Sequence, residues 1–156
     1  MGAHVNRIGR LLAGVLAIVS ASAALAADIG QVKVVKGQVS IERDGQTVPA
    51  TVAMRLRTLD TVKTGANGSI GINMSDNSLL SLGPNSSLSL DRYEFDATTQ
   101  QGGFDTSLQK GSLAVVSGRI AKQSPEAMTV RTPFAVLGVR GTEFVVSAED
   151  GTPIWR

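Results

Sequence analysis

Apolar and polar residues alternate in short segments along most of the chain after residue 26. The clearest example is Ile70, Ile72 and Met74, which are separated by small or polar residues. This period of two is typical of a strand that buries one face. Similar segments follow at residues 80–82 and 88–90, and polar turns separate the three. The pattern predicts an all-β fold: a single domain of short antiparallel strands, arranged as a sandwich, a jelly roll or a β-solenoid-like ladder.

Strand signals continue on both sides of this region. Two valine-rich segments, residues 31–36 and 38–43, precede Asp44-Gly45, a dipeptide that favours a two-residue hairpin turn. Residues 104–108 and 112–116 are expected to form a further strand pair that turns at the glycine between them. No long segment shows the helical period, which agrees with an all-β prediction.

Residues 130–146 form the densest apolar segment of the part that follows residue 26. Its many β-branched residues favour a strand over a helix. Pro133 removes one backbone donor and keeps the residue before it out of the α region. We therefore predict a short strand at residues 129–131, a bend at Thr132-Pro133 and then a long buried strand.

Arg140 is set into this apolar segment, where a guanidinium needs hydrogen-bond acceptors. In a structural role, Arg140 would bridge Glu143 or carbonyl groups at strand ends and fix a corner at Gly141. In a functional role, it would present its planar fork to a carboxylate of a partner. The neighbours Val139 and Phe144 resemble core residues, which favours the structural role. We also expect Gly141 to adopt a backbone conformation that a side chain resists.

Three segments, in this order, resemble the signature of the FecR-like domain family. They are residues 59–65 (LDTVKTG), residues 108–113 (LQKGSL) and residues 132–146 (TPFAVLGVRGTEFVV). The sequence departs from the family pattern at Leu59, where the family usually has glycine. The resemblance extends over most of the chain after the N-terminal region.

The resemblance implies a non-catalytic periplasmic module for interaction or signalling. The motif residues that a partner would contact are then Arg140, Gly141, Thr142, Glu143 and Phe144. The best-known members of the family relay a signal from an outer-membrane transporter to a cytoplasmic sigma factor, using a cytoplasmic segment and a membrane span that precede the domain. Fewer than a dozen residues precede the first apolar stretch here. We therefore expect that the sigma-regulating part is missing.

The N-terminus has the order of a secretory signal peptide. Arg7 and Arg10 precede an apolar stretch at residues 11–19, and Ala24-Leu25-Ala26 matches an A-x-A cleavage site. Cleavage after Ala26 would release a mature domain of residues 27–156 into the periplasm or the medium, without a membrane span. The alternative is an uncleaved anchor, although the stretch is short for a spanning helix.

Removal of the signal peptide, residues 1–26, changes the charge of the protein. The whole chain has 15 basic and 13 acidic residues, and Arg7 and Arg10 lie in the signal peptide. The mature part is formally neutral, with 15 − 2 = 13 basic residues against 13 acidic ones. This balance gives no electrostatic support for a nucleic-acid partner.

The mature part contains neither histidine nor cysteine, because the one histidine is His4. This composition excludes Ser-His-Asp and Cys-His nucleophiles and His- or thiolate-bound zinc. We therefore expect no enzymatic activity, no metal and no cofactor. The loops also lack the lysine of a phosphate-binding cradle.

Residues 91–96 alternate charged and aromatic side chains. A carboxylate-dependent hydrolase would need a pair drawn from Asp91, Glu94 and Asp96. A structural or glycan-binding protein of the cell envelope would instead use Tyr93 and Phe95 for sugar contacts. The favoured interpretation is simpler: the charges form the wet face of a strand, and both aromatic rings pack inward.

The favoured partner is a protein of the cell envelope. After the apolar strand from Glu143 to Ala148, the sequence offers a turn and then only Thr152-Pro153-Ile154-Trp155-Arg156. Proline cannot donate to a strand ladder, so this end is expected to make a poor edge strand. We predict that a partner strand, or a second copy, adds to the edge from Glu143 to Ala148. The alternative is that Ile154 and Trp155 fold back and seal that edge.

Overall fold

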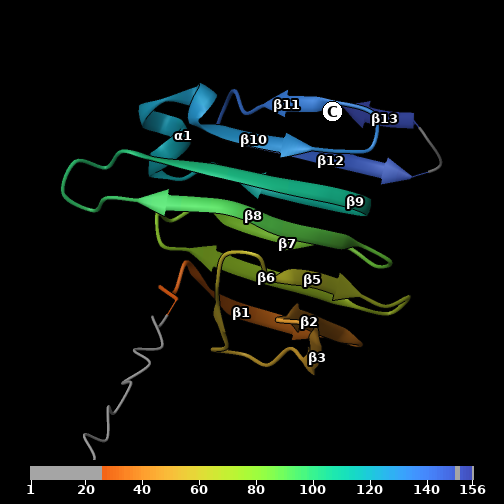
Figure 1. Ribbon diagram of the computed structural model, residues 1–156. Helices are drawn as coiled ribbons and strands as arrows, with labels where there is room; N and C mark the ends of the chain where they lie inside the picture. The colour runs from red at the N-terminus through yellow and green to blue at the C-terminus, as the bar shows by residue number, and fades with distance from the viewer. Residues whose placement is uncertain (1–25, 150–151, 156) are drawn as a thin grey trace, which may run out of the picture.

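The all-β prediction is confirmed by the computed structural model, which describes residues 26–149 and 152–155. Figure 1 shows the strands crossing the molecule one beside another, from β1–β3 at one end to β10–β13 at the other. The strands are β1 (Gly30–Lys36), β2 (Val39–Arg43), β3 (Gln46–Pro49), β4 (Arg55–Leu56), β5 (Thr61–Thr64), β6 (Ser69–Met74), β7 (Leu79–Leu82), β8 (Ser87–Phe95), β9 (Gly102–Val116), β10 (Met128–Arg131), β11 (Val136–Gly138), β12 (Glu143–Glu149) and β13 (Thr152–Trp155). Between β9 and β10 lie the α-helix α1 (Arg119–Gln123) and the 3-10 helix η1 (Pro125–Ala127).

The strands form two layers that share β9. Sheet 1 has the order β3-β2-β5-β8-β9-β10-β11, and sheet 2 has the order β4-β1-β6-β7-β9-β12-β13. The chain passes repeatedly from one sheet to the other, so consecutive strands stack along the molecule (Figure 1). Most neighbours are antiparallel, and the pair formed by β9 and β10 is parallel.

The long strand β9 corrects the prediction of a hairpin at residues 104–116. One half of β9 pairs with β8 and β10 in sheet 1, and the other half pairs with β7 and β12 in sheet 2. Gly111 lies between the halves with a φ of 87°. A Cβ atom there would lie 2.1 Å from the side chain of Ser86. The glycine therefore lets the strand change sheets instead of turning back.

The core lies between the two sheets and follows the alternation of the sequence. Ile70, Ile72 and Met74 on β6 are almost fully buried, as predicted, and face Leu80 and Leu82 from the neighbouring strand β7. Burying a large aliphatic side chain contributes roughly 1.5–3 kcal/mol to folding. Repeated over both sheets, this contribution explains how a domain without disulfides holds together.

The predicted hairpin at Asp44-Gly45 is confirmed. β2 and β3 pair with Arg43 opposite Gln46, so the turn has two residues. Asp44 and Gly45 have φ values of 51° and 74°. Positive φ at both positions is the requirement of the type I′ turn that Asp-Gly favours.

The prediction of one long buried strand from residue 136 to residue 146 is wrong. β11 ends at Gly138 and pairs with β10 in sheet 1, whereas β12 begins at Glu143 and pairs with β9 in sheet 2. The residues between them form a loop in which Arg140 is exposed. The apolar segment therefore supplies strands to two sheets, which a continuous hydrophobic pattern does not reveal.

The open edge predicted along β12 is partly closed. β13 pairs with β12 from Val146 opposite Trp155 to Glu149 opposite Thr152, and Pro153 lies opposite Ala148. The alternative, in which the end of the chain folds back, is therefore correct for this half of β12. A partner strand could therefore add to β12 only along the stretch from Glu143 to Val145.

Candidate functional site

A groove of about 450 Å³ opens between β11 and β12, at the C-terminal end of the sheets. Val139 and Val146 are buried at its base, and the half-buried side chains of Leu137 and Phe144 line it. Arg140 belongs to the lining and is exposed. The groove therefore combines an apolar floor with one cationic group, and we call it the C-terminal groove.

The structural role expected for Arg140 included a salt bridge to Glu143. Among the salt bridges of the described residues, none involves Arg140, so the expected bridge to Glu143 is not formed. Arg140 also borders a second hollow of about 260 Å³, lined by Pro125, Glu126 and Gly138. The exposed side chain of Arg140 thus borders two concave surfaces.

Two hydrogen bonds from Ser117 fix the backbone of the Arg140 loop. Ser117, at the end of β9, donates from Oγ to the carbonyl of Gly141 at 2.9 Å, and its backbone N–H donates to the carbonyl of Thr142 at 2.8 Å. Gly141 has a φ of 103°, so the expected conformation is present. Thr142 and Glu143 are exposed. The loop therefore holds its backbone to the sheet and directs its polar side chains outward.

Tyr93 and Phe95 do not form an exposed aromatic pair. Tyr93 is 8% exposed, and its ring meets that of Phe104 edge-on, with 5.1 Å between centroids. Phe95 is partly buried against the core. This placement agrees with the interpretation that both rings pack inward, and it leaves little ring surface for a sugar.

The Tyr93 hydroxyl belongs to a buried polar cluster around Asp76. The hydroxyl donates to Asp76 Oδ1 at 3.1 Å and accepts from the Asp76 backbone N–H at 2.7 Å. Burial, and then the nearby Asp76 carboxylate, raise the pKa of Tyr93. The phenol therefore stays protonated at any physiological pH.

Asp76 also connects the β6–β7 turn to α1. Ser78 donates to the carboxylate from its backbone N–H at 3.1 Å and from Oγ at 2.8 Å, and the backbone N–H of Ile120 donates at 3.2 Å. All of these groups are buried. Nothing in the neighbouring sequence distinguishes Asp76 from an ordinary turn residue, because its partner Ile120 lies 44 residues away along the chain.

A second buried aspartate, Asp60, lies in the segment of residues 59–65 that resembles the family signature. Arg43 donates to both of its oxygens, from Nε to Oδ1 at 2.8 Å and from Nη2 to Oδ2 at 2.6 Å. The hydrogen bond to Asp60 is the largest cause that raises the pKa of Arg43. Asp60 also accepts the backbone N–H of Arg57 at 2.8 Å. This bidentate pair ties β2 to the turn before β5.

The three carboxylates considered for hydrolysis have separate roles. Asp91 accepts from the hydroxyls of Ser89 and Ser107 on sheet 1. Asp96 accepts two backbone N–H groups in the turn that follows β8. Glu94 is exposed. Within the described residues, no group of three or more acidic, histidine or cysteine side chains is arranged to hold a metal ion.

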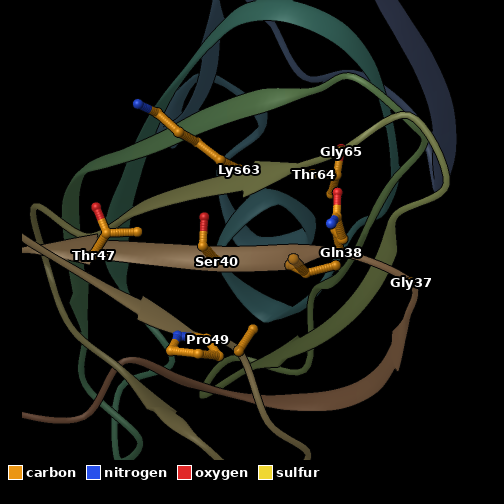
Figure 2. Close-up of a pocket in the computed structure, with 10 residues that line it drawn as sticks. Gly37, Gln38, Ser40, Thr47, Pro49, Lys63, Thr64 and Gly65 are labelled. Carbon is orange, nitrogen blue, oxygen red and sulfur yellow. The ribbon is translucent and has the colours of Figure 1, made fainter.

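A larger but more polar hollow, of about 660 Å³, lies along β2 between β3 and β5. Figure 2 shows that Ser40, Thr47 and Lys63 border it, and that the Lys63 amine points away from its centre. Lys63 is paired with Glu42. The hollow thus offers hydroxyl groups and backbone, without a charge left over to fix a ligand.

Comparison with known proteins identifies one family. The family model described as FecR protein matches residues 60–154, which include Asp60, the Arg140 loop and both walls of the C-terminal groove. Neither the curated proteins nor the solved structures contain a match to the chain.

Proposed function

The chain belongs to the FecR protein family, and from this premise we propose that it is a non-catalytic interaction module of the periplasm, which binds a protein partner during signalling. The family is a signalling family. The proposal extends this by assigning the binding to the C-terminal groove and by placing the protein outside the cytoplasm.

The observation that carries the proposal is the exposed Arg140 beside an apolar groove. A guanidinium binds a carboxylate through two parallel hydrogen bonds, and it adds direction to an apolar contact. Interface energy is concentrated in a few anchors of this kind, an aromatic or aliphatic group in a pocket and an arginine beside it. The partner segment should therefore carry an apolar side chain next to an aspartate or glutamate.

Strand addition supplies less support than the groove. The free stretch of β12, from Glu143 to Val145, is three residues long, and β13 covers the rest. A three-residue ladder gives few hydrogen bonds to a docking strand. We therefore propose that the partner inserts a side chain into the C-terminal groove, with any pairing along β12 as a supplement.

Export of the protein is part of the proposal. The signal peptide, residues 1–26, lies outside the described residues apart from Ala26. Of the residues that the structure describes, none belongs to a helix with the length and hydropathy that a bilayer span requires. The mature domain would then be residues 27–156. Mass spectrometry of the periplasmic fraction should find Ala27 as the first residue, and an intact N-terminus in the membrane fraction would contradict this step.

The groove is tested by cross-linking in intact cells. A photoreactive amino acid in place of Leu137, whose half-buried side chain lines the groove, should capture one envelope protein. Arg140→Glu should abolish that adduct, because the partner carboxylate then meets a like charge. Arg119→Glu, at an exposed position of α1, is the matched control and should leave the adduct unchanged. An adduct that survives Arg140→Glu, or that disappears in both variants, would reject the groove as the binding site.

A further inference from the structure

The outer face of sheet 2 is apolar along its middle, whereas solvated sheet faces are normally polar. Four of its side chains are well exposed: Val34, Leu79, Val116 and Val145, at 48%, 45%, 39% and 43%. Leu79 lies opposite Val116 in the ladder, and Val145 lies one strand beyond, on the same face. We call these four residues, with the small residues between them, the sheet 2 face. A contiguous apolar surface of this kind indicates an interaction site.

The residues between the four large side chains make the face flat and uncharged. Gly71 pairs with both Val34 and Ser81, and Ser81 pairs with Ala114. Ala114 in turn pairs with Val145. One row across five strands therefore reads valine, glycine, serine, alanine and valine. A flat row of small side chains permits close approach of a second flat surface.

Opposite charges lie on the two sides of this face. Lys33 and Lys36 are exposed on β1, and Glu143 is exposed on β12. β1 and β12 are four strand spacings apart, which is about 19 Å. Lys33 and Glu143 therefore do not pair within one molecule, and the face has a positive side and a negative side.

We propose that the sheet 2 face binds the same face of a second copy of the chain, about a two-fold axis that runs parallel to β7. β7 is the middle strand of the five, so the axis places Leu79 on Leu79 of the second copy. The same rotation places Val34 opposite Val145 and Lys33 beside Glu143 of the second copy, each contact occurring twice. The face is complementary to itself in both shape and charge.

The alternative two-fold axis, perpendicular to the strands, gives a poorer match. It places β12 of one copy on β12 of the other, so that Glu143 lies near Ser147 of the second copy. Lys33, whose amine donates to Gln31 Oε1 at 3.0 Å, and Lys36 then face no acidic side chain of the second copy. Charge complementarity therefore selects the axis parallel to β7. Exposed charges at the rim contribute little affinity, but they fix the register of association.

The size of the face sets the strength of the dimer. Five strands and five residues along each strand cover about 24 Å by 17 Å, which is about 400 Å² per copy. Specific interfaces usually bury about 800 Å² per partner, so this one belongs to the weak, reversible class. We expect a monomer–dimer equilibrium that shifts with protein concentration.

Sedimentation equilibrium of the protein, purified in the form that the cell produces, tests the proposal. The protein should dimerise reversibly, and Leu79→Lys should abolish the dimer because two ammonium groups would face each other at the axis. Leu59→Lys is the matched control, since Leu59 is 74% exposed near β5 and β8 of sheet 1. It should leave the dimer intact. Unchanged thermal melts would show that both variants fold.

A charge exchange tests the orientation of the two copies. Lys33→Glu and Glu143→Lys should each raise the dissociation constant severalfold, and the double variant should restore it. A protein that is monomeric at every concentration, or a dimer that persists in Leu79→Lys, overturns the proposal. A double variant no tighter than the two single variants overturns it as well, because the lysine and the glutamate would then not meet between copies.

Discussion

Two charged residues within the family match, Asp60 and Arg140, are used in opposite ways. Asp60 is 1% exposed, and its oxygens accept from the Arg43 fork and from a backbone N–H. Arg140 is exposed at the rim of the C-terminal groove and is absent from the salt bridges of the described residues. One charge holds two parts of the fold together, whereas the other is available for contacts outside the molecule.

The difference teaches that membership in a family signature does not assign a role. Asp60 precedes β5, which pairs on both sides inside sheet 1, so its turn is covered by neighbouring strands. Arg140 lies in the loop between edge strand β11 and β12, where few elements cover it. Burial, which depends on position in the sheets, decides whether a charge must be satisfied internally.

The largest effect is expected from removing the buried acid. Asp60→Ala leaves the Arg43 guanidinium and a backbone donor without acceptors, so the free energy of unfolding should fall by about 3 kcal/mol. Urea denaturation measures this, with Glu94→Ala as the exposed control, expected within about 0.5 kcal/mol of the natural protein. The double variant Asp60→Ala with Arg43→Ala should recover part of the loss. An equal loss in the free energy of unfolding for Asp60→Ala and Glu94→Ala would show that Asp60 does not hold the fold together.

A smaller loss is expected in the exposed loop, and from its backbone alone. Gly141 has a φ of 103° and open space around its Cβ position, so Gly141→Val should cost about 2 kcal/mol through conformational strain. Gly138→Val is the matched control, because Gly138 also has open space but no positive φ. Thermal melts of the two variants should separate them. If both melt at the same temperature, the conformation of Gly141 is not needed to hold the loop.

The buried phenol of Tyr93 should make the stability of the protein depend on pH in the alkaline range. The raised pKa of Tyr93 means that the unfolded chain loses its phenol proton near pH 10 while the folded chain keeps it. The contribution of the Tyr93 phenol to the free energy of unfolding is therefore fully present below pH 10. Above pH 10 this contribution should fall by about 1.4 kcal/mol for each pH unit. Tyr93 is the one tyrosine of the sequence, so tyrosinate absorbance reports it alone. Titration in the folded protein near pH 10 would contradict the burial argument, and Tyr93→Phe should lack this part of the slope.

The smallest effect on stability is expected at Arg140. Arg140→Ala should change the free energy of unfolding by less than about 0.5 kcal/mol, because the side chain is exposed and forms no salt bridge with the described residues. Differential scanning calorimetry is sufficient to detect a larger change. A loss comparable to that of Asp60→Ala would show that Arg140 is structural, as the sequence first suggested.

Local chemistry in the sequence was enough for several features of the fold. The alternation through Ile70, Ile72 and Met74 identified the buried side of β6, and Asp44-Gly45 identified the β2–β3 turn. Gly141 was correctly expected to adopt a backbone conformation that a side chain resists. In each case the signal lies within a few residues, because side-chain direction and turn type depend on the immediate backbone.

The sequence by itself determined the class of the protein: its strand alternation, its lack of histidine and cysteine after the N-terminal region, and its family signature. Only the tertiary structure decided which sheet each strand joins and which charges are buried. The apolar segment after residue 130 contributes to both sheets, and β9 passes between them at Gly111. Asp76 finds its donors on Tyr93 and Ile120, distant in sequence. Such pairings depend on long-range packing, and a pattern read along the chain does not specify them.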